Sequence, residues 1–149
     1  MKLYNYAVVF REIPDEVTLA LNISECPHRC PGCHSPELQS DKGTPIDRAL
    51  IRRLIEENDG ITCVCFMGGD RDITFLQQTA LYIHEEYGLK VAWYTGSSFI
   101  NWRSFEFFDY IKIGPYRADR GPLDSKTTNQ VLFKKQKGLL YNITEQMQH

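Results

Sequence analysis

The chain has 149 residues, of which 42% are hydrophobic and 24% charged, with a formal net charge of −2. These values predict one globular domain over residues 1–149, with roughly the last ten residues frayed. They exclude a dominant basic patch for nucleic acid, and no apolar run is long enough to span a membrane. The stretch after Met1 has no signal-peptide core and the cysteine count of five is odd, so we expect a cytoplasmic protein without a disulfide framework.

Two strands are expected in the first part of the chain. Residues 4–10 are largely apolar, and hydrophobic residues occupy every second position of residues 17–24. The second strand leads directly toward Cys26. A helix is then expected after Thr44, with Thr44 as its N-cap and Asp47 as the acidic third residue.

Strands and helices alternate along the rest of the chain. The patterns predict strands over residues 61–67, 89–94, 110–113 and 131–133, and helices over residues 72–87 and 99–108. Such alternation predicts right-handed βαβ units and a mainly parallel sheet. About five strands are too few to close an eight-stranded barrel. The expected α/β fold is therefore an open, curved, mainly parallel sheet, a partial (βα) barrel.

Three short motifs each follow an expected strand. A cysteine triplet follows residues 17–24, Gly68-Gly69-Asp70 follows residues 61–67, and Thr95-Gly96 comes after the next strand. Ligands collect at the carboxyl ends of the strands in parallel α/β sheets. The three motifs are therefore predicted to lie on the same edge of the sheet and to form one site.

The triplet consists of Cys26, Cys30 and Cys33, with the spacing C-x3-C-x2-C. Structural zinc sites and most iron–sulfur clusters take four protein ligands. Three thiolates in one short segment therefore indicate a metal site with one coordination position left for another molecule.

Other interpretations of the triplet remain open from the residues alone. A zinc site could recruit His34, although this residue adjoins the last cysteine, or it could recruit Cys63 or Cys65. A redox pair formed by the last two cysteines would leave the first without a role. Cys63 and Cys65 point to the same face of an expected strand, and we interpret them as core residues.

Gly68-Gly69 would allow a ligand to approach the backbone without interference from a Cβ atom. Asp70 could accept a hydrogen bond from a ligand ammonium group. It could also cap the helix expected near residue 72, and the two roles are compatible.

Taken together, the segment from Cys26 to His34 and the motif Met67-Gly68-Gly69-Asp70 resemble the radical SAM superfamily. The chain is most similar to the activating proteins of anaerobic (class III) ribonucleoside-triphosphate reductases. Further matching motifs are Trp93-Tyr94-Thr95-Gly96, Ile113-Gly114-Pro115-Tyr116 and Thr128-Asn129-Gln130. Two positions depart from the family pattern: Arg71 stands where many relatives have proline, and Ser125-Lys126 stands where Arg-Gly is common.

The resemblance implies a fold of radical SAM type and one [4Fe-4S] cluster, whose fourth iron is chelated by S-adenosylmethionine. It implies no catalytic residue beyond the cluster ligands. The implied ligands of the irons are Cys26, Cys30 and Cys33. The implied contacts of S-adenosylmethionine are Gly32, Cys33, His34, Gly68, Gly69, Asp70 and Thr95.

The same resemblance implies that S-adenosylmethionine is reductively cleaved and that the resulting radical takes a hydrogen atom from a glycine of the reductase. The implied partners are that reductase and a low-potential electron donor such as flavodoxin. The alternatives are another small radical SAM enzyme, such as a different glycyl-radical activase or a deazaguanine-forming synthase, and a zinc-binding interaction module.

Overall fold

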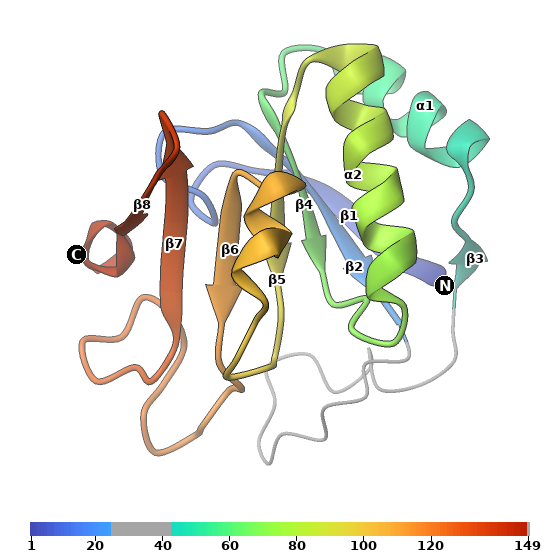
Figure 1. Cartoon of the computed structure of the whole chain (residues 1–149). Coiled ribbons are helices and arrows are strands. Elements are labelled where there is room, and N and C mark those ends of the chain that lie inside the picture. Colours follow the sequence, from blue (N-terminus) through green and yellow to red (C-terminus); the bar gives the residue numbers. More distant parts are fainter. Residues whose placement is uncertain (25–42, 149) are drawn as a thin grey trace.

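The computed structural model of the chain describes residues 1–24 and 43–148, and Figure 1 shows their arrangement. The described residues form one eight-stranded sheet with the strand order β3-β1-β2-β4-β5-β6-β7-β8. The strands are β1 (Lys2–Val9), β2 (Thr18–Ile23), β3 (Thr44–Pro45), β4 (Cys63–Met67), β5 (Lys90–Tyr94), β6 (Tyr110–Ile113), β7 (Val131–Gln136) and β8 (Leu139–Asn142). The helices are α1 (Arg48–Glu57), α2 (Ile73–Tyr87) and the 3₁₀ helices η2 (Trp102–Glu106) and η3 (Thr144–Met147).

The sheet is mixed. β2, β4, β5 and β6 run parallel to one another in its centre. On one side β1 pairs antiparallel with both β2 and β3, and on the other side β7 pairs antiparallel with both β6 and β8. The expected mainly parallel, partial (βα) barrel is therefore wrong. The described residues contain eight strands and only two α-helices, because antiparallel strands, rather than further βα units, extend both sides of the sheet.

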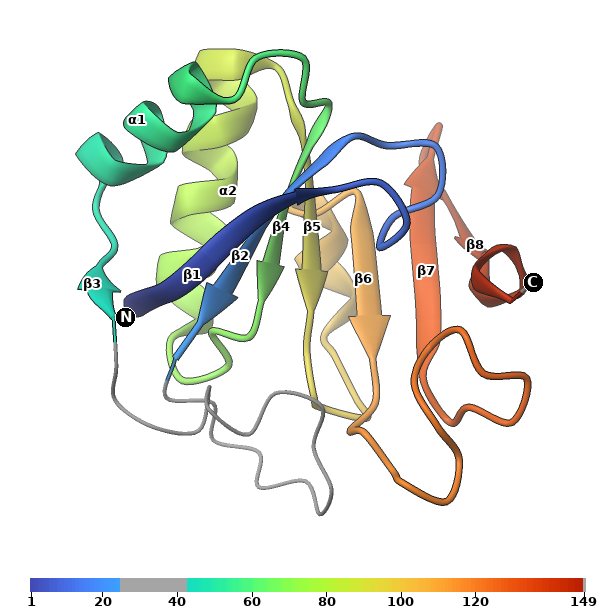
Figure 2. The same ribbon diagram turned by 180° about the vertical axis from the view of Figure 1, so that it is seen from behind.

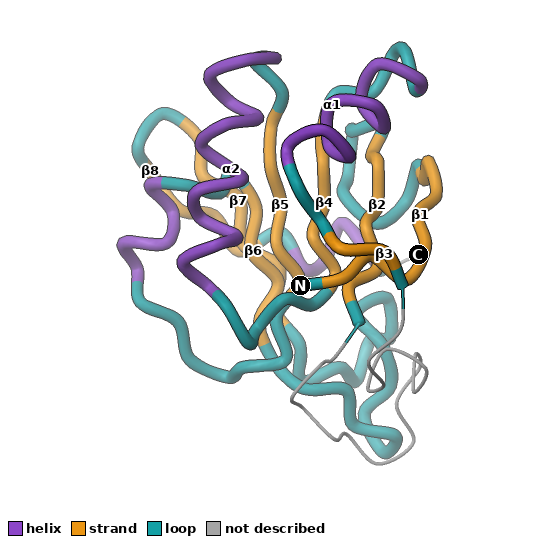
Figure 3. Tube along the Cα trace, turned by 90° about the vertical axis from the view of Figure 1, so that its right-hand side faces the viewer, coloured by secondary structure: helices purple, strands orange, loops and turns teal. Residues whose placement is uncertain are grey.

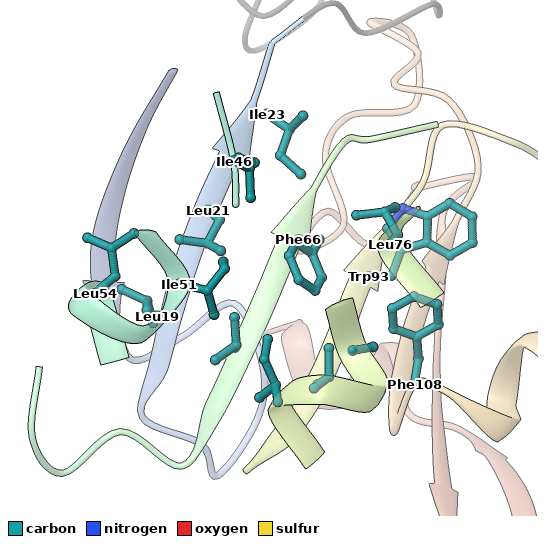
Figure 4. Close-up of a cluster of buried hydrophobic side chains, with 14 of the residues drawn as sticks. Leu19, Leu21, Ile23, Ile46, Ile51, Leu54, Phe66, Leu76, Trp93 and Phe108 are labelled. Carbon is teal, nitrogen blue, oxygen red and sulfur yellow. The ribbon is translucent and has the colours of Figure 1, made fainter. Parts of the chain in front are cut away.

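Both α-helices cover the same face of the sheet (Figures 1 and 2). Alternate strand residues point toward them, as expected for a pleated strand. Figure 4 shows part of this core, which includes Leu19, Leu21, Ile23, Ile51, Leu54, Phe66, Leu76, Trp93 and Phe108. Each fully buried side chain of this size contributes about 1.5–3 kcal/mol relative to exposure.

The opposite face of the sheet carries no α-helix from the described residues (Figure 2). Loops and the C-terminal η3 cover it instead. The buried residues on this face are Ile13, Cys63, Cys65, Ala92, Tyr110, Leu123, Leu132, Ile143 and Met147. No helix within residues 1–24 and 43–148 combines the length and apolar character needed to cross a bilayer.

The central elements confirm the sequence patterns. The predicted strands over residues 17–24, 61–67, 89–94 and 110–113 correspond to β2, β4, β5 and β6. The predicted helix over residues 72–87 is α2, which ends at Gly88 in the left-handed conformation with φ 64°.

Three local predictions need correction. Thr44 does not cap a helix, because Thr44–Pro45 pairs with β1 and Asp47 is the N-cap of α1, where its carboxylate accepts from the Leu50 amide at 2.8 Å. The helix predicted over residues 99–108 is only the five-residue 3₁₀ helix η2. β8 was not predicted, and it follows a tight turn in which Lys137 and Gly138 both have positive φ, 51° and 77°.

A half-buried polar contact joins the end of α2 to the residue before β6. The Asp109 carboxylate oxygen Oδ2 lies 2.9 Å from His84 Nε2 and accepts from the Val91 amide at 2.9 Å. Burial raises the pKa of Asp109. The hydrogen bonds from His84 and Val91 and the charges of His84 and Lys135 outweigh this effect and hold the pKa below its ordinary value.

This contact predicts a loss of stability in acid. A carboxylate whose pKa is lowered by folding stabilises the fold above its unfolded-state pKa of about 3.9, and this stability is lost as the pH falls toward the folded-state value. Asp109→Asn should lower the free energy of unfolding at neutral pH by about 1–2 kcal/mol and flatten the acid side of the stability curve. Urea unfolding from about pH 7 to about pH 3 measures both effects. Equal acid slopes in the two proteins would contradict this assignment.

Candidate functional site

The parallel strands β2, β4, β5 and β6 end on one edge of the sheet, and the loops that follow β4, β5 and β6 gather at that end of the molecule (Figure 3). The predicted site residues Cys26, Cys30, Gly32, Cys33 and His34 lie outside the described residues. The structure describes the other four, Gly68, Gly69, Asp70 and Thr95, and places all of them on this carboxyl edge.

The described residues on either side of the triplet segment are both held against β1. The Ser24 amide donates to the Lys2 carbonyl at 3.0 Å. Gly43 packs so closely that an added Cβ atom would lie 2.0 Å from the Leu3 carbonyl oxygen. Ser24 and Gly43, the described residues that flank the triplet segment, therefore both lie beside the carboxyl edge.

The Gly68-Gly69 turn lies beside the first of these residues. Gly68 has φ 108°, and a Cβ atom on it would lie 3.1 Å from the Ile23 carbonyl oxygen. Trp93 holds the turn from β5, because its indole Nε1 donates to the Gly68 carbonyl at 2.9 Å. Gly69 has φ 84°, and a Cβ atom there would lie 2.8 Å from Leu76 Cδ1. Both glycines are thus required by the backbone itself.

Gly69→Ala is expected to destabilise the fold and displace Asp70. Gly60→Ala is a matched control, since Gly60 has nearly the same φ, 86°, but no atom within 4 Å of its added Cβ. The control should cost about 1–2 kcal/mol for the left-handed backbone alone. Gly69→Ala should cost about 1–3 kcal/mol more, because Leu76 must move. Equal losses of unfolding free energy in the two variants would show that the contact with Leu76 has no effect.

Asp70 and Thr95, predicted from separate motifs, contact each other directly. The Asp70 oxygen Oδ2 accepts from the Thr95 hydroxyl at 2.9 Å and from the Gly96 amide at 3.1 Å. The Thr95 hydroxyl also accepts from the Ser97 amide at 3.0 Å, and Thr95 is only 1% exposed. The buried Thr95 hydroxyl therefore fixes the orientation of the Asp70 carboxylate.

The alternative role of Asp70 as the cap of α2 is wrong. Asp72 is the N-cap, and its carboxylate accepts from the Phe75 amide at 3.1 Å. Asp70 lies two residues earlier and is bonded to the loop after β5. The two aspartates thus have separate functions, one in the candidate site and one in the helix.

A third loop extends the site beyond β6. The Gly114 amide donates to the Ser97 carbonyl at 2.7 Å, which joins this loop to the one that carries Thr95. The Gly114 carbonyl accepts from Lys112 Nζ and from Gln130 Nε2, both at 3.2 Å. Lys112 is 8% exposed and its ammonium group lies 5.5 Å from the centre of the Tyr94 ring. Lys112 was not predicted as a site residue, although a lysine within a short apolar strand is a signal that could have identified it.

Cys63 and Cys65 are core residues, as predicted. Both thiols are fully buried and free, on the sheet face opposite α1 and α2. Burial raises the pKa of both thiols, and the nearby Glu16 adds to the effect at Cys63. Within the described part of the chain, no group of three or more His, Cys, Asp and Glu residues is placed to hold a metal ion.

The chain matches the family of 4Fe-4S single cluster domains over residues 16–129. It belongs to this family. The expected iron–sulfur protein is therefore confirmed, while the match does not specify which reaction the cluster supports. No curated protein and no solved structure matches the chain.

The residues of this 4Fe-4S single cluster domain fit such a cluster. Iron–sulfur clusters are held by cysteine thiolates. The matched span contains the whole triplet Cys26, Cys30 and Cys33 as well as Cys63 and Cys65. Cys63 and Cys65 are buried core residues of β4, and the other three thiols of the matched span are those of the triplet.

Proposed function

We propose that this 4Fe-4S single cluster domain is a radical SAM activase that generates a glycyl radical on an anaerobic ribonucleoside-triphosphate reductase. Cys26, Cys30 and Cys33 would hold three irons of the cluster, and S-adenosylmethionine would bind the fourth. One observation carries the proposal: the burial of Cys63 and Cys65 leaves three of the five cysteines for a single cluster. A four-iron cluster with three thiolates has one iron available for another ligand.

The described part of the carboxyl edge supplies groups for the methionine end of S-adenosylmethionine. Thr95 and Gly96 fix the Asp70 carboxylate through hydrogen bonds of 2.9 and 3.1 Å. A fixed carboxylate makes a strong, charge-assisted hydrogen bond with an ammonium group. Gly68 and Gly69 hold the turn that leads to Asp70 close against Ile23 and Leu76 at the same edge. Gly32, Cys33 and His34 would complete these contacts from the triplet segment.

With both groups bound, the reduced cluster and S-adenosylmethionine would together supply a radical able to take a hydrogen atom from carbon. The role of the protein is then to orient S-adenosylmethionine and to admit the glycine loop of the reductase. Phe99, in the loop that follows Thr95, is 88% exposed. An exposed aromatic side chain beside the site favours a protein as the substrate. The electron would come from a low-potential donor such as flavodoxin.

The test is anaerobic mixing of the reconstituted protein with a class III reductase, S-adenosylmethionine and a reductant. A glycyl radical signal in the electron paramagnetic resonance spectrum is the expected result. The matched controls omit S-adenosylmethionine or replace the accepting glycine of the reductase by alanine, and neither should give the signal. Cleavage of S-adenosylmethionine without any glycyl radical would reject the reductase as the substrate.

A further inference from the structure

Asn129, in the loop before β7, has one buried polar atom that nothing in the described structure satisfies. Its Nδ2 donates to the Pro115 carbonyl at 3.1 Å. Its Oδ1 is buried and has no hydrogen-bond partner among residues 1–24 and 43–148. A flip of the amide would set Oδ1 against the Pro115 carbonyl, two acceptors facing each other, so the orientation of Asn129 is fixed.

The surroundings hold this acceptor in place. The neighbouring Gln130 is 8% exposed and donates to the Gly114 carbonyl at 3.2 Å. Gly114 packs so closely that an added Cβ atom would lie 3.4 Å from the Asn129 carbonyl oxygen. The hydrogen bond to Pro115 holds Oδ1 in its buried position. A buried acceptor without a donor is destabilising, which indicates that a donor reaches it in the working protein.

Asn129 lies on the same sheet edge as Asp70. β7 runs antiparallel to β6 with Val131 opposite Ile113, so the loop before β7 lies at the carboxyl end of β6. Three strand positions separate β7 from β4, which Asp70 follows. At about 4.8 Å per strand the ends of β4 and β7 are roughly 14 Å apart. An amino acid joined to a nucleoside can reach across that distance.

We infer that Asn129 Oδ1 accepts a hydrogen bond from a donor on the nucleoside part of S-adenosylmethionine. This inference rests on the proposed function. The donors of S-adenosylmethionine are its ammonium group, two ribose hydroxyls and the adenine amino group. Asp70 accounts for the ammonium group at the other end of the site. The remaining donors all belong to the nucleoside, and a neutral amide oxygen is a suitable acceptor for each of them.

The test measures binding of S-adenosylhomocysteine, which cannot be cleaved, to the anaerobically reconstituted protein by titration calorimetry. Asn129→Leu removes the acceptor and should raise the Kd about tenfold, which corresponds to about 1.4 kcal/mol. Asn129→Leu also removes the hydrogen bond to the Pro115 carbonyl, and modified ligands separate the two contacts.

Three ligand analogues identify the donor: the 2′-deoxy, the 3′-deoxy and the N6-dimethyl forms of S-adenosylhomocysteine. One analogue should bind the wild-type protein about tenfold more weakly than S-adenosylhomocysteine does. The same analogue and S-adenosylhomocysteine should bind Asn129→Leu with equal affinity, because that variant lacks the acceptor. Equal losses in both proteins for every analogue would overturn the inference. If Asn129→Leu does not fold, the wild-type protein alone decides: the inference is overturned if that protein binds all three analogues as tightly as S-adenosylhomocysteine. Wild-type protein that binds no S-adenosylmethionine would instead reject the proposed function itself.

Discussion

Cys30→Ala is expected to lose the iron–sulfur cluster and, with it, the cleavage of S-adenosylmethionine. Cys30 is the middle of three thiols in a C-x3-C-x2-C segment, and two thiolates are too few to retain a four-iron cluster. Iron should fall from about four per chain to nearly none after anaerobic reconstitution. The measurements are iron and sulfide content, visible absorption, and the 5′-deoxyadenosine formed with a reductant.

Cys65→Ala is the matched control for this experiment. It also removes one thiol, but from the buried centre of β4. This variant should keep the cluster and its activity while losing about 1 kcal/mol of unfolding free energy, because a small cavity is left in the core. Full cleavage activity in Cys30→Ala, or loss of the cluster in Cys65→Ala, would reject the assignment of the triplet.

Asp70→Asn should weaken the binding of S-adenosylmethionine by about 10-fold to 100-fold with little effect on stability. The amide oxygen of asparagine can still accept from the Thr95 hydroxyl and the Gly96 amide, which lie 2.9 and 3.1 Å from Asp70 Oδ2. What is lost is the negative charge that, in the proposed site, would face the ammonium group of the ligand. Calorimetric titration of the reconstituted protein measures the change in Kd.

Asp72→Ala separates this effect from helix capping. Asp72 lies two residues away and accepts from the Phe75 amide at 3.1 Å. Its replacement should cost about 1 kcal/mol of unfolding free energy and leave the Kd unchanged. If Asp70→Asn binds as tightly as the wild type, or if Asp72→Ala weakens binding to the same degree, Asp70 does not contact the ligand.

The centre of the fold could be predicted from the sequence because its strands carry strong hydrophobic patterns. β4 is a continuous apolar run that is covered on both faces, and α2 has apolar residues at helical spacing and a glycine stop. The outer strands β3 and β8 could not be predicted in this way. All four residues of β8 are exposed, so burial leaves no alternation in its sequence. The mixed sheet depends on such weakly patterned antiparallel strands.

The location of the candidate residues at the carboxyl edge could be predicted in part. Gly68, Gly69, Asp70 and Thr95 were identified because each follows a strand, and the order of the strands places them together. The hydrogen bond between Asp70 and Thr95 joins residues 25 positions apart. Sequence patterns describe neighbours along an element and carry no information about such a contact. The bond from Gln130 to Gly114, across 16 positions, was beyond prediction for the same reason.

The central claim is that the cluster of this domain has one iron that binds S-adenosylmethionine. The most direct measurement is the electron paramagnetic resonance spectrum of the reduced, reconstituted protein with and without S-adenosylmethionine, together with its metal content. We predict about four irons per chain and a spectrum that changes when S-adenosylmethionine is added. One zinc per chain, or a cluster spectrum that S-adenosylmethionine leaves unchanged, would contradict the account.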